Sequence, residues 1–327
     1  MCIIKIFFLI LQLYPTSATI WRTLAISLQK NIDNMMNNDR GQILIRMKKT
    51  LLALAIGLFV WMLPLSAQEW TLVWSDEFNV DGRPDESVWS FEQGFQRNHE
   101  DQWYQADNAW QQDGLLIIEA RRDDRPNPLY RAGSRQWAAQ RQRISYTSSC
   151  LHTRGKFDFL YGRMEVSARI PTAGGAWPAI WTLGNGMEWP SCGEIDVMEY
   201  YRINNVPHIL ANVAWGNDRR FDAVWNSRRT PFSHFLGKDA DWAQQFHLWR
   251  MDWNEQSIRI YLDDELLNEI PLSTTVNGSI GQYVNPFTKP QYILLNLALG
   301  GDNGGTIDDT AFPMRYEIDY VRIYKPE

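Results

Sequence analysis

Cysteine and histidine are scarce in this 327-residue chain, which has 3 Cys and 5 His. The cysteines form no C-x-x-C pair and the histidines do not cluster, so the sequence predicts no zinc site. No basic run occurs after residue 67 and the formal net charge is −6, which disfavours nucleic acid as a partner. Internal repeats, low-complexity tracts and sustained helical periodicity are also missing from that part of the chain. These absences argue against a repeat protein and against a helical bundle.

Long apolar runs are missing too, since the stretch 51–65 is shorter than a membrane span requires. It follows a short basic segment that begins at Met47, and it ends in small residues. That order is typical of a secretory signal peptide. We therefore expect 47–67 to be a signal peptide and the protein to be exported, to the periplasm or out of the cell, with no stable membrane insertion after cleavage. We expect 1–46 to be an over-extended start or an unstructured extension, the alternative being a first membrane anchor.

The part that remains, 68–327, is of ordinary size for a single all-β domain. Its apolar residues fall in short runs separated by Gly, Pro, Asn and Asp, which is typical of strands. The predicted strands are 70–78, 115–120, 155–161, 163–170, 208–214, 246–253, 257–262, 292–299 and 316–324. Asp263 and Asp264 between two of them predict a hairpin turn. Many short strands joined by turns predict an antiparallel sandwich.

Three acids lie within six residues, at Glu194, Asp196 and Glu199. In a regular strand Glu194 and Asp196 share a face, whereas Glu199 lies on the opposite one. One extra residue near 197–198, a β-bulge, would return Glu199 to the face of the other two. Because like charges at this separation repel, at least one of these carboxyls should have a raised pKa.

Glycoside hydrolysis with retention of configuration uses such an arrangement. It needs an ionised carboxylate as nucleophile and a protonated carboxyl as general acid, about 5–5.5 Å apart. A carboxyl between them can hydrogen-bond the nucleophile and keep the two protonation states different. The polar outer face of an ordinary strand is the alternative explanation of the spacing.

The stretch Glu194–Glu199 resembles the bulged E-x-D-x-x-E signature of glycoside hydrolase family 16, the form typical of laminarinases (endo-β-1,3-glucanases), β-agarases and porphyranases. Further blocks that resemble the family are Ser75–Phe78, Thr153–Lys156, Tyr161–Arg163, Gly175–Trp181, Asn296–Gly301 and Ile318–Tyr324. The resemblance covers roughly residues 69–325. It implies a concanavalin A-like β-jelly roll of two antiparallel sheets, with a substrate cleft across the concave one. It also implies that Glu194 is the nucleophile, Asp196 its supporting acid and Glu199 the acid/base.

Tryptophan is abundant, with 16 residues in the chain, most of them after residue 67. Some should face the C–H surfaces of sugar rings, although core packing explains many of them. Trp177, Trp181 and Trp189 flank the acids and resemble the sugar platforms of the family. Asn98 and Glu100 resemble a polar pair that lines the non-reducing side of its cleft, the alternative being a solvated loop.

Two departures from the family pattern bear on the substrate. Ala214 stands where laminarinases usually have His, and 300–305 lacks the Trp that often follows their Gly-Gly pair. We expect a retaining endo-β-glycanase acting on a β-1,3- or mixed-linkage β-1,3/1,4-glucan. The alternatives are an agarase- or porphyranase-like galactanase and a non-catalytic carbohydrate-binding protein. The presence of all three acids argues against the latter, while transglycosylation would use the same carboxylates.

No cofactor is expected for catalysis, but a structural Ca²⁺ is implied by the resemblance. Glu77 and Asp319 stand in blocks that supply its ligands in many family members, and hard oxygen ligands suit this ion. In an oxidising compartment Cys150 and Cys192 either pair or remain two buried thiols. We expect a monomer whose partner is the polysaccharide substrate.

Overall fold

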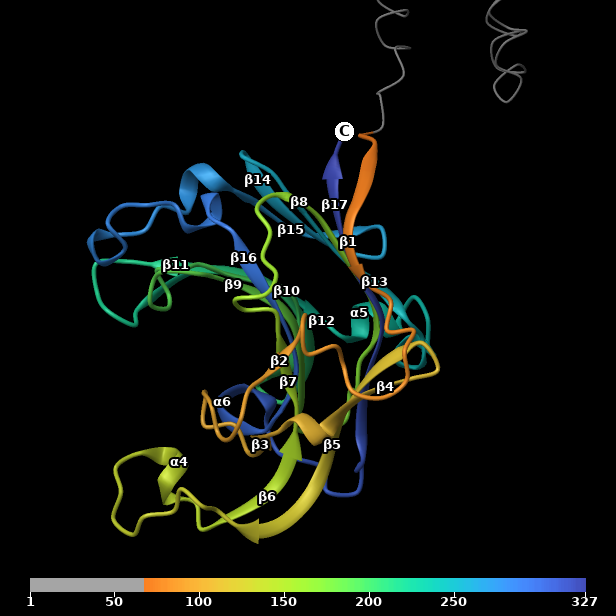
Figure 1. Cartoon of the computed structure of the whole chain (residues 1–327), viewed down its shortest axis with the longest axis vertical. Helices are drawn as coiled ribbons and strands as arrows, with labels where there is room; N and C mark the ends of the chain where they lie inside the picture. Colours follow the sequence, from red (N-terminus) through yellow and green to blue (C-terminus); the bar gives the residue numbers. More distant parts are fainter. Residues whose placement is uncertain (1–67) are drawn as a thin grey trace, which may run out of the picture. The chain divides into compact units, whose positions relative to one another are not determined.

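The computed structural model describes residues 68–327, and Gln68–Glu327 form one compact unit. The predicted signal peptide, 47–67, and the segment 1–46 lie outside the described residues. Two β-sheets pack face to face in the described part (Figure 1). No helix in this part is long and apolar enough to cross a membrane.

The larger sheet has ten strands in the order β15-β14-β13-β8-β17-β5-β6-β3, with β1 beside β17 and β4 beside β5. They are β1 (Trp70–Asp76), β3 (Gln102–Tyr104), β4 (Ala109–Gln112), β5 (Leu115–Pro126), β6 (Arg143–Ser148), β8 (Gly162–Arg169), β13 (His247–Trp253), β14 (Ser257–Leu262), β15 (Glu265–Pro271) and β17 (Met314–Pro326).

The smaller sheet has seven strands in the order β12-β11-β10-β9-β16-β7-β2. They are β2 (Ser90–Phe91), β7 (Cys150–His152), β9 (Ala176–Gly184), β10 (Glu194–Ile203), β11 (Val206–Gly216), β12 (Ala223–Pro231) and β16 (Gln291–Leu299). The short helices are α4 (Trp137–Gln140), α5 (Ser233–Leu236), α6 (Gly301–Gly304) and the 3₁₀ turns η2 (Ala106–Asn108), η3 (Trp242–Gln244), η4 (Leu272–Thr274), η5 (Ser279–Gly281) and η6 (Pro286–Thr288). The all-β sandwich is confirmed. One strand pair, β3 with β6, is parallel and departs from the predicted antiparallel pattern.

The core lies between the inner faces of the two sheets. Strand β8 alternates buried and half-buried residues along its whole length, and its Met164 and Val166 belong to the core cluster. Ile195 and Tyr200 of β10 enter the same cluster from the other sheet. Burial of apolar surface, worth about 25 cal/mol per Å², is the main force that holds the sheets together. Strand β16 is buried at every position, so other parts of the protein cover both of its faces.

The alternation over 155–161 predicts a strand, and that prediction is wrong. The segment begins with a turn in which the N–H groups of Lys156 and Phe157 donate to the carbonyl of Thr153. Within residues 68–327, its only β-pairing with another segment is one isolated bridge, between Phe159 and Gln291. Phe157 stacks on Trp74 with ring centroids 4.3 Å apart. The alternating aromatics therefore serve side-chain packing and not a hydrogen-bonded ladder.

Two smaller predictions can be compared with the structure. Asp263 and Asp264 form the turn between β14 and β15, which pair antiparallel as expected for a hairpin. Cys150 and Cys192 are both free and buried, which decides between the disulfide and the two thiols. Burial raises the pKa of both thiols, that of Cys192 to about 12.

Candidate active site

Strand β10 shifts its register in the middle, where the acids lie. Asp196 pairs with Asn212 of β11, and Glu199 pairs with Leu210. An advance of three residues along β10 therefore matches an advance of two residues along β11. The pairing of β10 with β9 shifts at the same place. This irregularity is the β-bulge that the motif predicts.

The bulge sorts the side chains of β10 onto two faces. The residues that enter the core are all at most 1% exposed and are Ile195, Val197, Met198 and Tyr200. The acids Glu194, Asp196 and Glu199 point to the opposite face. Successive side chains of a strand alternate between its faces, and the bulge places two successive residues, Val197 and Met198, on the core side. We call this side of the seven-stranded sheet the open face. Three carboxyls thus gather on one side of one strand.

Two indoles hold the outer acids in place. Nε1 of Trp189 donates to Oε2 of Glu194 at 2.7 Å, and Nε1 of Trp177 donates to Oε1 of Glu199 at 2.8 Å. Each hydrogen bond fixes the position of its carboxyl, and the bond to Glu194 is the stronger one when that carboxyl is ionised. Trp189 is half-buried on the loop before β10, whereas Trp177 on β9 is only 5% exposed. Trp177 reaches the site through its N–H edge, and sugar contact by either residue stays a prediction.

Asn212 of β11 joins two of the acids, and sequence reasoning missed it. Its Nδ2 donates to Oδ2 of Asp196 at 3.2 Å and to Oε2 of Glu199 at 3.1 Å. The side chain is 3% exposed, so it is fixed between the carboxyls. Its position depends on the register of β11 against β10. A shift of one residue would turn it to the other face, and no sequence signal sets that register in advance.

Burial raises the pKa values of all three acids. It raises the pKa of Glu194 to about 7, although the N–H of Trp189 acts in the opposite direction. Burial raises the pKa of Glu199 to about 8, and the charge of Glu194 adds to this. Burial also raises the pKa of Asp196 well above its usual range, helped by the charges of both neighbours. Near neutral pH, Glu194 is therefore the first to ionise, while protonated Asp196 hydrogen-bonds it.

Trp181 of β9 presents no open ring, because it is 8% exposed. Its Nε1 donates to Oδ1 of Asn296 at 2.7 Å. The guanidinium of Arg97 lies over its ring, 5.2 Å from the centroid, and forms an ion pair with Glu92. The positive charge of Arg97 lowers the pKa of Glu194. Trp181 thus supports a cation near the nucleophile, and its contact with sugar stays a prediction.

Asn98 and Glu100 lie in the loop before β3. Nδ2 of Asn98 donates to Oε1 of Glu100 at 3.3 Å, and Nε2 of Gln102 donates to the other oxygen at 2.7 Å. Glu100 is 2% exposed, and its charge contributes to the raised pKa of Glu199. The structure therefore brings Glu100 within electrostatic reach of the acids and leaves Asn98 exposed beside it.

The model of the glycosyl hydrolases family 16 matches residues 95–322. The match includes the bulged strand with its three acids, the indoles that hold two of them, and Asn212. The chain belongs to glycosyl hydrolases family 16. As a family 16 member it is a glycoside hydrolase and acts on O-glycosyl bonds.

Several known proteins are similar to this chain over most of its length. A beta-glucanase of Rhodothermus marinus is 34% identical over 272 residues, which are 79% of this chain and 86% of that protein. The laminarinase catalytic domain of Thermotoga maritima has a TM-score of 0.66 and 30% identity, over 80% of this chain and 100% of that one. A structure described with the endo-acting O-glycanases by which human gut microbes initiate mucin breakdown has a TM-score of 0.69 and 31% identity, over 81% and 93%.

The two departures from the laminarinase pattern of family 16 both border the site. Ala214 lies opposite Glu194 in the pairing of β10 with β11 and is fully buried. The loop 300–305 packs against the loop of Asn98. A Cβ at Gly301, where φ is +61°, would lie 2.6 Å from the carbonyl oxygen of Asn98, so only glycine fits there.

Glu77, one of the two residues predicted to bind Ca²⁺, forms an ion pair with Arg322. Both carboxylate oxygens of Glu77 accept hydrogen bonds from Arg322, at 2.9 and 2.7 Å. Asp319 is half-buried on β17. No group of three His, Cys, Asp or Glu side chains within 68–327 is placed to hold a metal ion. The guanidinium of Arg322 beside Glu77 opposes a second cation at that carboxylate, and the structural Ca²⁺ stays a prediction.

Proposed function

We propose that this family 16 hydrolase is a retaining endo-β-glycanase that cleaves a β-1,3- or mixed-linkage β-1,3/1,4-glucan. The observation that carries the proposal is the set of three buried acids on one face of β10, two of them held by the indole N–H groups of Trp189 and Trp177. A double-displacement hydrolase needs such a pair of carboxyls, because the nucleophile must be ionised while the general acid is protonated. The similarity to a beta-glucanase and to a laminarinase supports the glucan.

The reaction proceeds in two steps. The carboxylate of Glu194 attacks the anomeric carbon while Glu199 gives its proton to the glycosidic oxygen, which leaves with the first product. This forms a covalent glycosyl ester on Glu194. The carboxylate of Glu199 then takes a proton from water, the water oxygen attacks the anomeric carbon, and Glu194 is released. Asp196 donates a hydrogen bond to Glu194, and Asn212 holds Asp196 and Glu199 in their relative positions.

A galactose-containing β-glycan is the second candidate substrate. It is favoured by Ala214, which leaves the nucleophile without the histidine that laminarinases usually have beside it. A binding-only protein has less support, since it would need neither three clustered acids nor the indoles that hold them.

Reducing-sugar release from laminarin, mixed-linkage β-glucan, agarose, porphyran and xyloglucan tests the proposal. We expect release from laminarin, from mixed-linkage glucan or from both, with oligosaccharides of several lengths as early products. Release from agarose or porphyran alone would replace the glucan by a galactan. Binding without release from any of the five would contradict the assignment of a hydrolase to these substrates.

The pH dependence of kcat/KM should be bell-shaped with its maximum near pH 7 to 8. Activity falls below about pH 7 because Glu194 becomes protonated and cannot attack. It falls above about pH 8 because Glu199 loses the proton that the leaving group needs. Initial rates on a soluble oligosaccharide measure the profile, with circular dichroism at each pH to exclude unfolding. A plateau across both values would contradict these protonation states.

We also propose that the protein is exported and acts as a monomer. The support for export is the pattern of 47–67 together with a substrate too large to cross a membrane. The support for a monomer is that all three acids and their hydrogen-bond partners come from one chain. N-terminal sequencing of secreted protein and light scattering test the two points, which a retained 47–67 segment or a dimer mass would contradict.

A further inference from the structure

Strand β12, at the edge of the seven-stranded sheet, places an indole in line with the nucleophile. Glu194 of β10 pairs with Ala214 of β11, and Ala214 pairs with Trp225 of β12. Residues directly opposite one another on antiparallel strands share a face. Trp225 therefore lies on the open face, in the same row as Glu194 and two strands away, which is about 10 Å at the usual strand spacing.

The next residue on β12 confirms this orientation independently. Oδ1 of Asn226 accepts a hydrogen bond from Nδ2 of Asn268 at 3.2 Å. Asn268 belongs to β15 of the ten-stranded sheet, so Asn226 points towards the interior. Since successive side chains in a strand point to opposite faces, Trp225 must point outward to the open face.

The indole of Trp225 is 46% exposed, although tryptophan is costly to leave in water. Ala214 lies between Trp225 and the nucleophile in this row, and its side chain is a single, fully buried methyl group. Trp225 is therefore the exposed apolar side chain of the row that contains Glu194.

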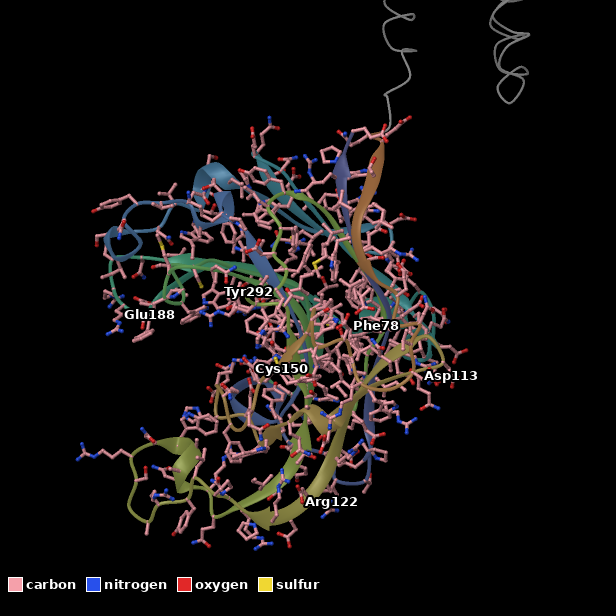
Figure 2. All side chains as sticks on the ribbon, viewed as in Figure 1. Phe78, Asp113, Arg122, Cys150, Glu188 and Tyr292 are labelled. Carbon is pink, nitrogen blue, oxygen red and sulfur yellow. The ribbon has the colours of Figure 1, made fainter. Side chains whose placement is uncertain are left out.

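The loop that leads into β12 is tied to the loop that carries Trp189. Arg220 makes two hydrogen bonds of 2.7 Å to Glu188, the residue before Trp189, and its guanidinium lies 4.7 Å from the ring centroid of Phe221. Figure 2 labels Glu188, which lies beside the ends of β9 and β11. Phe221 is 57% exposed and has a φ of +61°, a strained conformation for an aromatic residue. Such strain is often kept next to functional sites.

We propose that Trp225 is the platform of a sugar-binding subsite on β12, where it stacks against a pyranose ring of the glycan whose bond is cleaved. The ligand is a β-linked sugar unit at least one residue away from the cleaved bond, because two strands separate the indole from the nucleophile. Stacking buries apolar surface of both the ring and the indole. The subsite rests on the proposed glycanase function, and it gives β12 a part in the choice of substrate.

The test compares Trp225→Ala and Trp225→Phe with the wild type on oligosaccharides of increasing length and on a short aryl glycoside. Trp225→Ala should lower kcat/KM on the long oligosaccharides roughly 10-fold to 100-fold, while the rate on the short aryl glycoside stays unchanged. Trp225→Phe should recover most of the loss, because it keeps an aromatic face. The matched control is Trp110→Ala on β4 of the other sheet, which should leave the length dependence as it is.

Oligosaccharides labelled at the reducing end show which side of the cleaved bond the subsite occupies, because loss of the platform should shift the preferred bond. An equal loss on all lengths, or no change on any, would overturn the proposal. If the wild type cleaves none of these substrates, the glycanase function fails separately. Titration of the same oligosaccharides into Glu194→Gln protein, with and without Trp225→Ala, still tests the platform, and equal affinities would overturn it.

Discussion

Glu194→Gln should lower the rate of glucan hydrolysis by roughly 10⁴-fold to 10⁶-fold, as expected when a catalytic nucleophile is removed. An amide is neutral and cannot form the glycosyl ester. The fold should persist, because glutamine has the shape of glutamate and its amide oxygen can still accept the N–H of Trp189. Initial rates of reducing-sugar release and the midpoint of thermal unfolding measure the two effects.

The matched control for this change is Glu269→Gln on β15. Glu269 pairs with Arg259 on the surface of the other sheet, so the same chemical change there should leave the rate unaltered. A Glu194→Gln protein that retains activity within about tenfold of the wild type would remove Glu194 from the role of nucleophile.

Azide distinguishes the nucleophile from the other acids. Glu194→Ala leaves space for this small anion on the side from which the carboxylate attacks. On a substrate with a good leaving group, azide should then restore turnover and give a glycosyl azide of inverted configuration. The configuration is read by nuclear magnetic resonance. A retained product from this variant would mean that another residue is the nucleophile.

Glu199→Ala should lower hydrolysis of natural glucan by roughly 10²-fold to 10⁴-fold, the range for loss of general acid catalysis. The first step should be nearly normal with a dinitrophenyl glycoside, because that leaving group needs no proton. The second step still lacks its base, so the glycosyl ester on Glu194 should accumulate. Mass spectrometry of the intact protein detects this adduct.

With Glu199→Ala, azide should attack the accumulated ester and release a product of retained configuration, the opposite of the result for Glu194→Ala. The reason is that the ester has already inverted the anomeric carbon once. Equal losses on natural glucan and on the dinitrophenyl glycoside, with no effect of azide, would show that Glu199 is not the acid/base.

The sequence was sufficient to predict the bulge, because only an extra residue brings Glu199 to the face of Glu194. It also predicted the long strands with clear alternation, such as β8 and β13. Strand β12 was missed, because an edge strand is exposed on both faces and its residues show little alternation. Without that strand the register that aligns Trp225 with Glu194 cannot be derived.

The roles of the tryptophans were harder to predict. The sequence places Trp177 and Trp181 near the acids, and the structure buries both and directs their N–H groups to Glu199 and Asn296. Ring exposure and N–H partners depend on residues that are distant in the chain, such as Arg97 over Trp181. Local spacing contains no information about those contacts.

The bulge in β10 has a consequence for insertion and deletion in this strand. Because Asp196 and Glu199 span only two residues of β11, they are as far apart along the sheet as positions i and i+2 of a regular strand. A chain shortened by Met198 would still place three acids on one face at the same spacing. What it would lose is a second adjacent apolar side chain in the core, next to Val197. The extra residue therefore adds a core contact to the strand and leaves the spacing of the acids unchanged. Motifs with and without this residue place the three acids in the same arrangement.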